Sequence, residues 1–350
     1  MVYFLLYILI CVLTWYGTPG PKRKLRLLKT SCIYLFLLMG LRSYSTGNDT
    51  YRYYLKFLQN QNMSWGEVIS QGPNFGFQIF TKLISVLTNN YSIYLMIIAG
   101  FIMLSIYYFL KEHSEDVLMS QIMLLSLGFI FFYMTGAKQT IAMGILLFAY
   151  TVLCKKKYIL FAILVIVAAS FHTTAIVFAV AWPLSMLKLK KSYFFVAPVL
   201  VAIAYAFRAP IFNFMRMLVI EQERYVLYGT TIVAQLSLTG LYIQLIIFAL
   251  SLFCLRNKFE EDTQLSGLFA LYTVGMMFQA MTGIMAEFFR LSMYYSIAGV
   301  ILLPKAMNRG FTESSTQIAK ILVISVFILY FVFFSSKNEY IIPFYFFFNQ

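Results

Sequence analysis

The sequence predicts an all-α, polytopic membrane protein, and three observations carry this prediction. Hydrophobic residues make up 61% of the 350 residues and charged residues only 11%, whereas a soluble domain has roughly 25% charged residues. The apolar residues gather in runs near the length that crosses a bilayer, about 20 residues. The charges lie between these runs. Because backbone polar groups inside a bilayer must be satisfied within the segment, we expect the runs to be helices.

About twelve apolar runs are expected to span the bilayer. They lie near residues 2–16, 27–41, 91–110, 117–134, 139–153, 158–171, 173–187, 193–207, 233–255, 264–285, 288–303 and 318–334. The first run has no basic segment before it and no small-residue cleavage site after it, so we expect a span and not a signal peptide. Residues 1–350 are expected to form a single integral membrane domain.

The basic loops predict the orientation of the spans. The segment GTPGPKRKLRLLK, residues 17–29, is dense in Lys and Arg, and short loops of this kind stay in the cytoplasm. Alternating from this loop places both termini outside and every other compact basic cluster inside. The longest external segments are then 42–90 and 208–232. An interfacial helix is expected in each, the first over 72–87 with Phe77, Phe80, Ile84 and Leu87 on one face.

The residues behind the net charge of +14 differ between the two predicted sides of the membrane, with most lysines on one side and most arginines on the other. Most lysines fall in the predicted cytoplasmic loops, which explains them without a nucleic-acid partner. The arginines of the external segments are not explained in this way; they are Arg42, Arg52, Arg208, Arg216, Arg224 and Arg290. A guanidinium binds phosphate or carboxylate through two donors, so a lipid-linked pyrophosphate is a candidate ligand. The alternative is that each arginine reaches ordinary phospholipid phosphates or pairs with a nearby acid.

Few residues can act as a general base in the external segments. His172 lies at a predicted external helix junction, and the ordinary histidine pKa, about 6.5, suits proton abstraction at neutral pH. The alternative is a helix-end histidine bonded to backbone. Asp49 is the second candidate, with a helix N-cap or an Arg42 partner as its alternative. His113 lies in a predicted cytoplasmic loop among acidic residues, where we expect it to be solvated. The cysteines and acids show no metal-binding spacing, so no metal or cofactor is expected.

The segment LRSYSTGNDTYRYY (41–54), with Arg42 before Gly47, Asp49 and Tyr53, resembles the opening signature of the EpsG-type family of Wzy-like exopolysaccharide polymerases. Further segments resemble this family in the same order. They are Gly76 with Phe77; Lys138, Gln139 and Ala142; His172, Thr173 and Thr174; and Arg290, Tyr294, Tyr295 and Pro304. The chain departs from the family pattern at Asn74, where an acidic residue often stands, and at Lys138, which replaces the usual arginine.

The resemblance implies a membrane glycosyltransferase of capsule, O-antigen or exopolysaccharide synthesis in the bacterial cytoplasmic (inner) membrane. It would transfer a growing glycan from undecaprenyl pyrophosphate to a lipid-linked repeat unit at the outer face. A flippase and a chain-length-regulating protein would be its partners beside the lipid bilayer. The base for the acceptor hydroxyl would be His172 or Asp49. The pyrophosphate and glycan would be bound by Arg42, Lys138, Gln139, Arg224, Tyr225 and Arg290, fixed groups in place of a metal.

Two other functions compete with this interpretation. A lipid-linked oligosaccharide flippase, which is a transporter and not an enzyme, is expected to carry charges deep in its spans and to have related halves. Neither feature is evident in the sequence. A membrane acyltransferase that modifies glycans needs a base together with an acyl donor from the cytoplasm, and the one histidine predicted on that side, His113, lies in an acidic loop.

Overall fold

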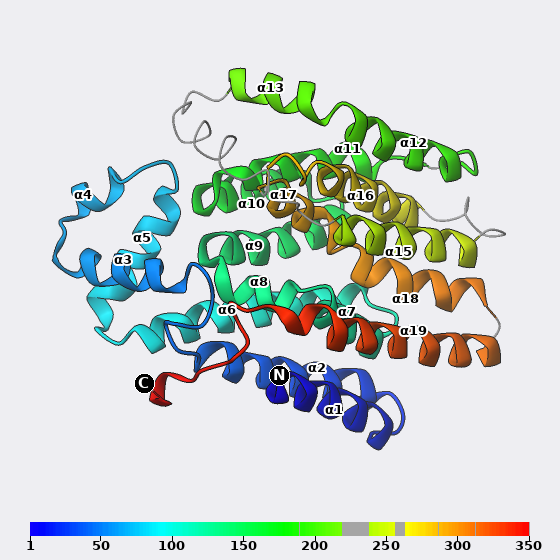
Figure 1. Ribbon diagram of the computed structural model, residues 1–350, viewed down its shortest axis with the longest axis horizontal. Coiled ribbons are helices and arrows are strands. Elements are labelled where there is room, and N and C mark those ends of the chain that lie inside the picture. Colours follow the sequence, from blue (N-terminus) through cyan, green and yellow to red (C-terminus); the bar gives the residue numbers. More distant parts are fainter. Residues whose placement is uncertain (189, 219–237, 256–262, 286, 312, 350) are drawn as a thin grey trace. The chain divides into compact units, whose positions relative to one another are not determined.

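The computed structural model describes residues 1–188, 190–218, 238–255, 263–285, 287–311 and 313–349. These residues are helical apart from turns, loops and one isolated antiparallel bridge between Arg42 and Phe346 (Figure 1), so the predicted all-α class is confirmed. The chain forms two compact units, Met1–Ala179 with Gln317–Gln350 and Val180–Thr316. That residues 1–350 act as a single membrane domain stays a prediction.

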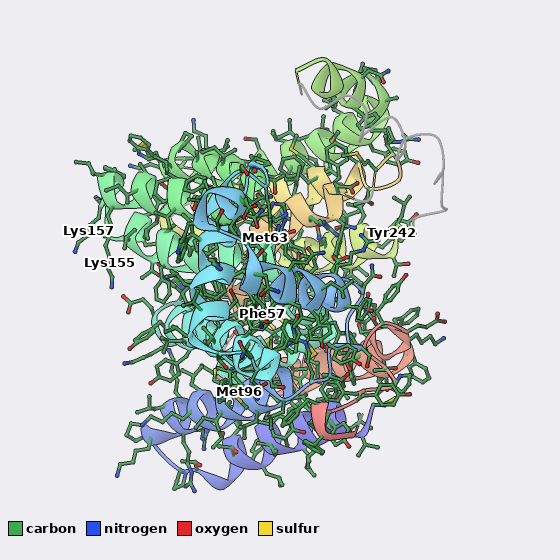
Figure 2. All side chains as sticks on the ribbon, turned by 90° about the vertical axis from the view of Figure 1, so that its left-hand side faces the viewer. Phe57, Met63, Met96, Lys155, Lys157 and Tyr242 are labelled. Atoms are coloured by element: carbon green, nitrogen blue, oxygen red, sulfur yellow. The ribbon has the colours of Figure 1, made fainter. Side chains whose placement is uncertain are left out.

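The first unit is built around α6 (Tyr91–His113), which packs between α2 (Lys22–Gly40) and α9 (Ala137–Cys154). The approach of α2 to α6 is close at Gly40, where a Cβ atom would lie 3.0 Å from Cγ of Met96 (labelled in Figure 2). The helices α1 (Val2–Gly17) and α10 (Tyr158–Phe171) cover α2 and α9 respectively.

A buried glutamine ties three of these helices together. Gln121 lies on α7 (Val117–Ser126) and accepts a hydrogen bond from the Tyr7 hydroxyl of α1 at 2.6 Å. Its amide nitrogen donates to the Ser31 hydroxyl of α2 at 2.9 Å. Satisfying a buried amide in this way fixes the register of the three helices, because an unpaired amide in an apolar interior is costly.

Three described helical segments are long and apolar enough to cross a membrane: Tyr91–His113, Ala137–Cys154 and Ser315–Lys337. The last segment contains most of α19 (Glu313–Phe333). A fourth span results if α7 and the following α8 (Phe129–Thr135) count as one, although they are bent by 54°. Shorter apolar helices accompany them, and together these segments indicate a multi-pass membrane protein. The number of about twelve spans and the orientation stay predictions.

Three predicted spans are interrupted, so the continuous helices expected there are wrong. The run 117–134 breaks between α7 and α8 at Gly128, whose φ of +80° lies in the left-handed region that glycine adopts readily. The run 288–303 divides into α17 (Glu287–Ser296) and α18 (Gly299–Gly310). Likewise, the run 173–187 begins as a 3₁₀ helix, Thr173–Val180, and continues as α11 (Ala181–Ser185). Apolar composition predicts where a chain enters the membrane but not where its helix bends.

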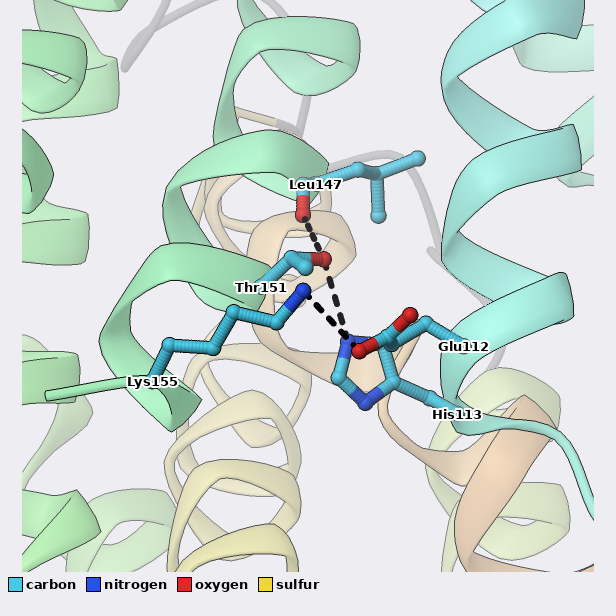
Figure 3. A network of polar contacts seen from close by, with 5 residues as sticks. All are labelled: Glu112, His113, Leu147, Thr151 and Lys155. Atoms are coloured by element: carbon cyan, nitrogen blue, oxygen red, sulfur yellow. Dashed lines mark hydrogen bonds and ion pairs between the residues drawn. The ribbon is translucent and has the colours of Figure 1, made fainter. Parts of the chain in front are cut away.

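His113 is not solvated, which corrects the expectation for this residue. Its side chain is 8% exposed and lies beside the Phe109 and Tyr150 rings. Its Nε2 is 3.0 Å from the Thr151 hydroxyl of α9 (Figure 3). The neighbouring Glu112 pairs with Lys155 at 3.0 Å. Because α6 continues as far as His113 and packs on α9, the imidazole faces the neighbouring helix and not water.

Polar contacts in the first unit join loops that are far apart in the sequence. Among the loops expected inside, Lys24 Nζ donates to the Ser114 carbonyl at 2.8 Å, and Lys155 meets Glu112. Lys155 and Lys157 project from the protein at this edge (Figure 2). Among the segments expected outside, the Thr50 hydroxyl donates to the Met134 carbonyl at 3.1 Å.

In the second unit, α16 (Thr263–Ala280) is central. It packs on α17, α11, α12 (Tyr193–Ala206) and α15 (Thr239–Leu255), and α15 packs on α18. The Tyr193 hydroxyl donates to Thr273 at 2.6 Å, which joins α12 to α16. The external helix expected within 208–232 is present as α13 (Arg208–Leu218), and the remainder of that segment lies outside the described residues.

Candidate functional site

The segment 42–90, which is predicted to be external, folds into α3 (Thr50–Asn62), α4 (Trp65–Ile69) and α5 (Phe75–Leu87), shown in blue and cyan in Figure 1. The helix expected over 72–87 is thus present as α5, but its predicted apolar face is wrong in part. Leu87 is 82% exposed, while Gln78 and Lys82 are buried. Lys82 Nζ donates to the Asn60 carbonyl at 2.7 Å. The C-terminal end of a helix carries free carbonyl groups and partial negative charge, which favour a cation. The Lys82 ammonium satisfies one of these carbonyls in α3 and so holds α3 on α5.

The turn before α3 requires glycine. Gly47 has a φ of +107°, and a Cβ atom there would lie 2.7 Å from the Met134 carbonyl oxygen. The Gly47 amide donates to the Tyr340 carbonyl at 2.8 Å. The tail of the chain continues along this turn, because the Ser43 amide donates to Tyr345 at 2.8 Å and the Phe347 amide to Leu41 at 3.0 Å. No pattern in the sequence predicts this contact.

Arg42 lies in the turn and is 2% exposed. Its guanidinium donates to the Met39 carbonyl, and its Nε has no hydrogen-bond partner among the described residues. Burial lowers the pKa of Arg42 to about 10, and the neighbouring Tyr91 and Tyr94 act in the opposite direction. The group is therefore a buried cation at neutral pH, with one buried N–H donor that no described residue satisfies.

Asp49 immediately precedes α3, as the N-cap alternative predicts, and its carbonyl accepts from the Tyr53 amide at 3.2 Å. Its side chain, however, makes no capping hydrogen bond to this described helix. The other alternative, a partner for Arg42, is not supported either, because the described hydrogen bond of Arg42 goes to Met39.

The N-terminus of α5 meets the C-terminus of α10 at His172. Oδ1 of Asn74 accepts from the Thr173 amide at 3.0 Å and from the Thr173 hydroxyl at 3.1 Å. At Gly76, a Cβ atom would lie 2.3 Å from Oγ of Ser170. His172 lies between these two contacts, ends α10, and has its Nδ1 3.3 Å from the Thr174 hydroxyl. Asn74 therefore positions the turn that carries the candidate base.

Phe77 connects this turn to the next group of residues. Its ring is 5.5 Å from that of Tyr53 on α3, and Lys138 Nζ lies 5.4 Å from its centroid. Lys138 and the buried Gln139 belong to the first turn of α9. Lys56 completes the group: burial, with a smaller contribution from Lys138, lowers its pKa to about 8. The sequence placed Lys56 outside but assigned it no role, because nothing in the spacing relates it to Lys138.

Three candidate residues lie outside the described part of the first unit. Arg290 is exposed on α17 of the second unit, near the buried Tyr294 and Tyr295. Arg224 and Tyr225 lie outside the described residues. Among the residues that the structure describes, no three His, Cys, Asp or Glu side chains are grouped so that they could hold a metal ion.

Replacing Asn74 with Ala is expected to lower activity by about tenfold to a hundredfold, because a displacement of about 1 Å at a reacting group costs that much. The change removes the acceptor of both Thr173 hydrogen bonds and releases the His172 turn from α5. Steady-state product formation by the purified variant measures the effect. Asn74→Asp keeps an acceptor oxygen and is the matched control, expected to remain active. Equal activity of Asn74→Ala and the native chain would contradict the positioning role.

The fold and the site together define a helical, multi-pass membrane protein whose motif residues meet beside α3, α5, α9 and α10. The chain matches the EpsG family over residues 25–346 and belongs to that family, which is linked to exopolysaccharide synthesis. No curated protein and no solved structure matches it.

Proposed function

We propose that the protein is a polysaccharide polymerase of the cytoplasmic membrane. It transfers a growing glycan from undecaprenyl pyrophosphate to a lipid-linked repeat unit at the outer face. A flippase that delivers the repeat units and a protein that regulates chain length would act beside it. Family membership supports the assignment to exopolysaccharide synthesis.

One observation carries the proposal: four motif segments that are far apart in the sequence gather in the first unit. They are the turn and helix at 42–54, Asn74–Phe77, Lys138 with Gln139, and His172–Thr174. The gathering combines partly buried cations, a histidine and a carboxylate-bearing turn. Transfer of a glycan from a pyrophosphate needs these three kinds of group.

In the proposed reaction, a hydroxyl oxygen of the acceptor repeat unit attacks the anomeric carbon of the donor glycan. The bond between that carbon and the pyrophosphate oxygen breaks, and its electron pair leaves with undecaprenyl pyrophosphate. His172 or Asp49 takes the hydroxyl proton. Arg42 and Lys138 stabilise the charge that develops on the leaving group. We assign Gln139, Arg224, Tyr225 and Arg290 to binding of the pyrophosphate and glycan.

Incubation of the purified protein with lipid-linked repeat units tests this function. A polymerase is expected to convert single units into a ladder of longer glycans and to release undecaprenyl pyrophosphate in proportion. Gel electrophoresis of the glycans and chromatography of the lipid measure the two products. Unchanged single units, transported across a vesicle membrane instead, would identify a flippase.

Replacing His172 with Ala is expected to lower the turnover number by about a hundredfold to ten-thousandfold, the usual contribution of a general base. Binding of the donor should stay the same, because the imidazole is assigned to the acceptor hydroxyl and not to the pyrophosphate. Single-turnover kinetics and donor binding separate the two effects. Normal turnover in this variant would transfer the role of base to Asp49, and Asp49→Asn is the variant that checks it.

A further inference from the structure

Two lysines from different helices share the surroundings of Phe77. Lys138 lies 5.4 Å from the Phe77 ring, and Tyr53 of α3 packs on the same ring at 5.5 Å. Lys56 follows Tyr53 by one helical turn, and residues three apart on a helix lie on the same side. Because α3 packs on α5, Lys56 lies near enough to Lys138 for the two charges to interact.

The charge of Lys56 is not compensated by the protein. In the described part of the chain, Lys56 makes no ion pair and no hydrogen bond, and its side chain is half-buried. Its lowered pKa, about 8, reflects this burial first and the nearby Lys138 second. Two partly desolvated cations repel one another, and a ligand with several negative charges removes this cost when it binds.

We propose that Lys56 and Lys138 together bind a diphosphate, and that this diphosphate is the pyrophosphate of the lipid-linked donor. An arginine offers two parallel donors from one planar group, whereas each lysine offers a compact charge. Two lysines on different helices can each contact one phosphate of a diphosphate. Lys56 is thus a further substrate-binding residue, and its assignment to the donor rests on the proposed function.

Binding of diphosphate by the full chain in phosphatidylcholine nanodiscs tests the pair. The two probes are undecaprenyl pyrophosphate and inorganic pyrophosphate, at pH 7, where Lys56 with its pKa of about 8 carries its charge. Lys56→Met is expected to weaken the binding of both by about tenfold, as for one lost charge-assisted hydrogen bond. Lys56→Arg keeps the charge and should bind like the native chain. Lys337→Met, an exposed lysine of the tail, is the matched control and should also leave binding unchanged.

A second set of variants distinguishes binding from folding. Lys56→Met with Lys138→Arg is expected to regain most of the lost affinity, because the guanidinium replaces the missing donor. A merely structural role of Lys56 would give no such recovery. Native affinity in Lys56→Met for both probes would overturn the proposal, and so would an equal loss in Lys337→Met. Loss of pyrophosphate binding when phosphatidylglycerol replaces phosphatidylcholine would overturn it as well, because the lysines would then bind phospholipid.

These experiments distinguish failure of the diphosphate site from failure of the proposed polymerase function. If the native chain binds diphosphate through Lys56 but forms no polymer, the diphosphate site stands and the polymerase assignment fails. If polymer forms and Lys56→Met changes neither binding nor glycan length, the diphosphate assignment of Lys56 fails by itself.

Discussion

Deletion of residues 338–350 is expected to abolish polymer formation and to destabilise the first unit by about 5 kcal/mol, at about 1 kcal/mol for each hydrogen bond lost. The tail accepts hydrogen bonds from Ser43, Thr46 and Gly47 and donates to Leu41 and Thr46. It also buries Ile341 completely. Because this tail holds the turn that carries Arg42, its loss should displace the guanidinium as well as unfold the turn.

Thermal unfolding in detergent and the in vitro glycan ladder measure the two effects of the deletion. The matched control is Phe348→Ala, which removes an exposed ring from the same tail and should alter neither. A shortened protein that melts at the native temperature and still makes long glycan would show that the turn holds its shape without the tail.

Much of the fold can be predicted from the sequence, because apolar runs of bilayer length must form helices. The helices α6, α9, α10 and α12 begin and end within a few residues of the predicted runs, since apolar length and flanking charge determine both limits. The bends could not be predicted in this way. Gly128 reads as an ordinary small residue in an apolar run, and its left-handed backbone appears only in the structure.

Some residues of the candidate site could likewise be predicted from the sequence, and others could not. The motif residues Asn74, Phe77, Lys138 and His172 could be chosen from the sequence, and the structure brings their segments together. Lys56 could not, because its role depends on the packing of α3 against α5 and on the position of Lys138 beyond them. The tail contact with the Arg42 turn was missed for a similar reason. It is made largely by backbone groups, which leave no residue pattern to recognise.

Gly76→Ala is expected to reduce activity by about a hundredfold, since misplacement of a reacting group by about 1 Å has that effect. The new Cβ would lie 2.3 Å from Oγ of Ser170 and 3.1 Å from its carbonyl carbon, so α5 and α10 must separate. Overpacking of this kind costs about 1–3 kcal/mol. The separation also acts on Asn74, two residues earlier, and therefore on its hydrogen bonds to Thr173 beside His172.

A second substitution on the opposing helix shows whether this contact is the cause. Ser170→Gly removes both Oγ and Cβ, the two side-chain atoms nearest to the added methyl group. It should restore much of the activity of Gly76→Ala, less about 0.5–1 kcal/mol of stability for glycine in a helix. Gly66→Ala on α4, where an added Cβ meets nothing within 4 Å, should be neutral by comparison. If Ser170→Gly brought no recovery, the loss in Gly76→Ala would not arise from the spacing of α5 and α10, and the His172 turn would be positioned by other contacts.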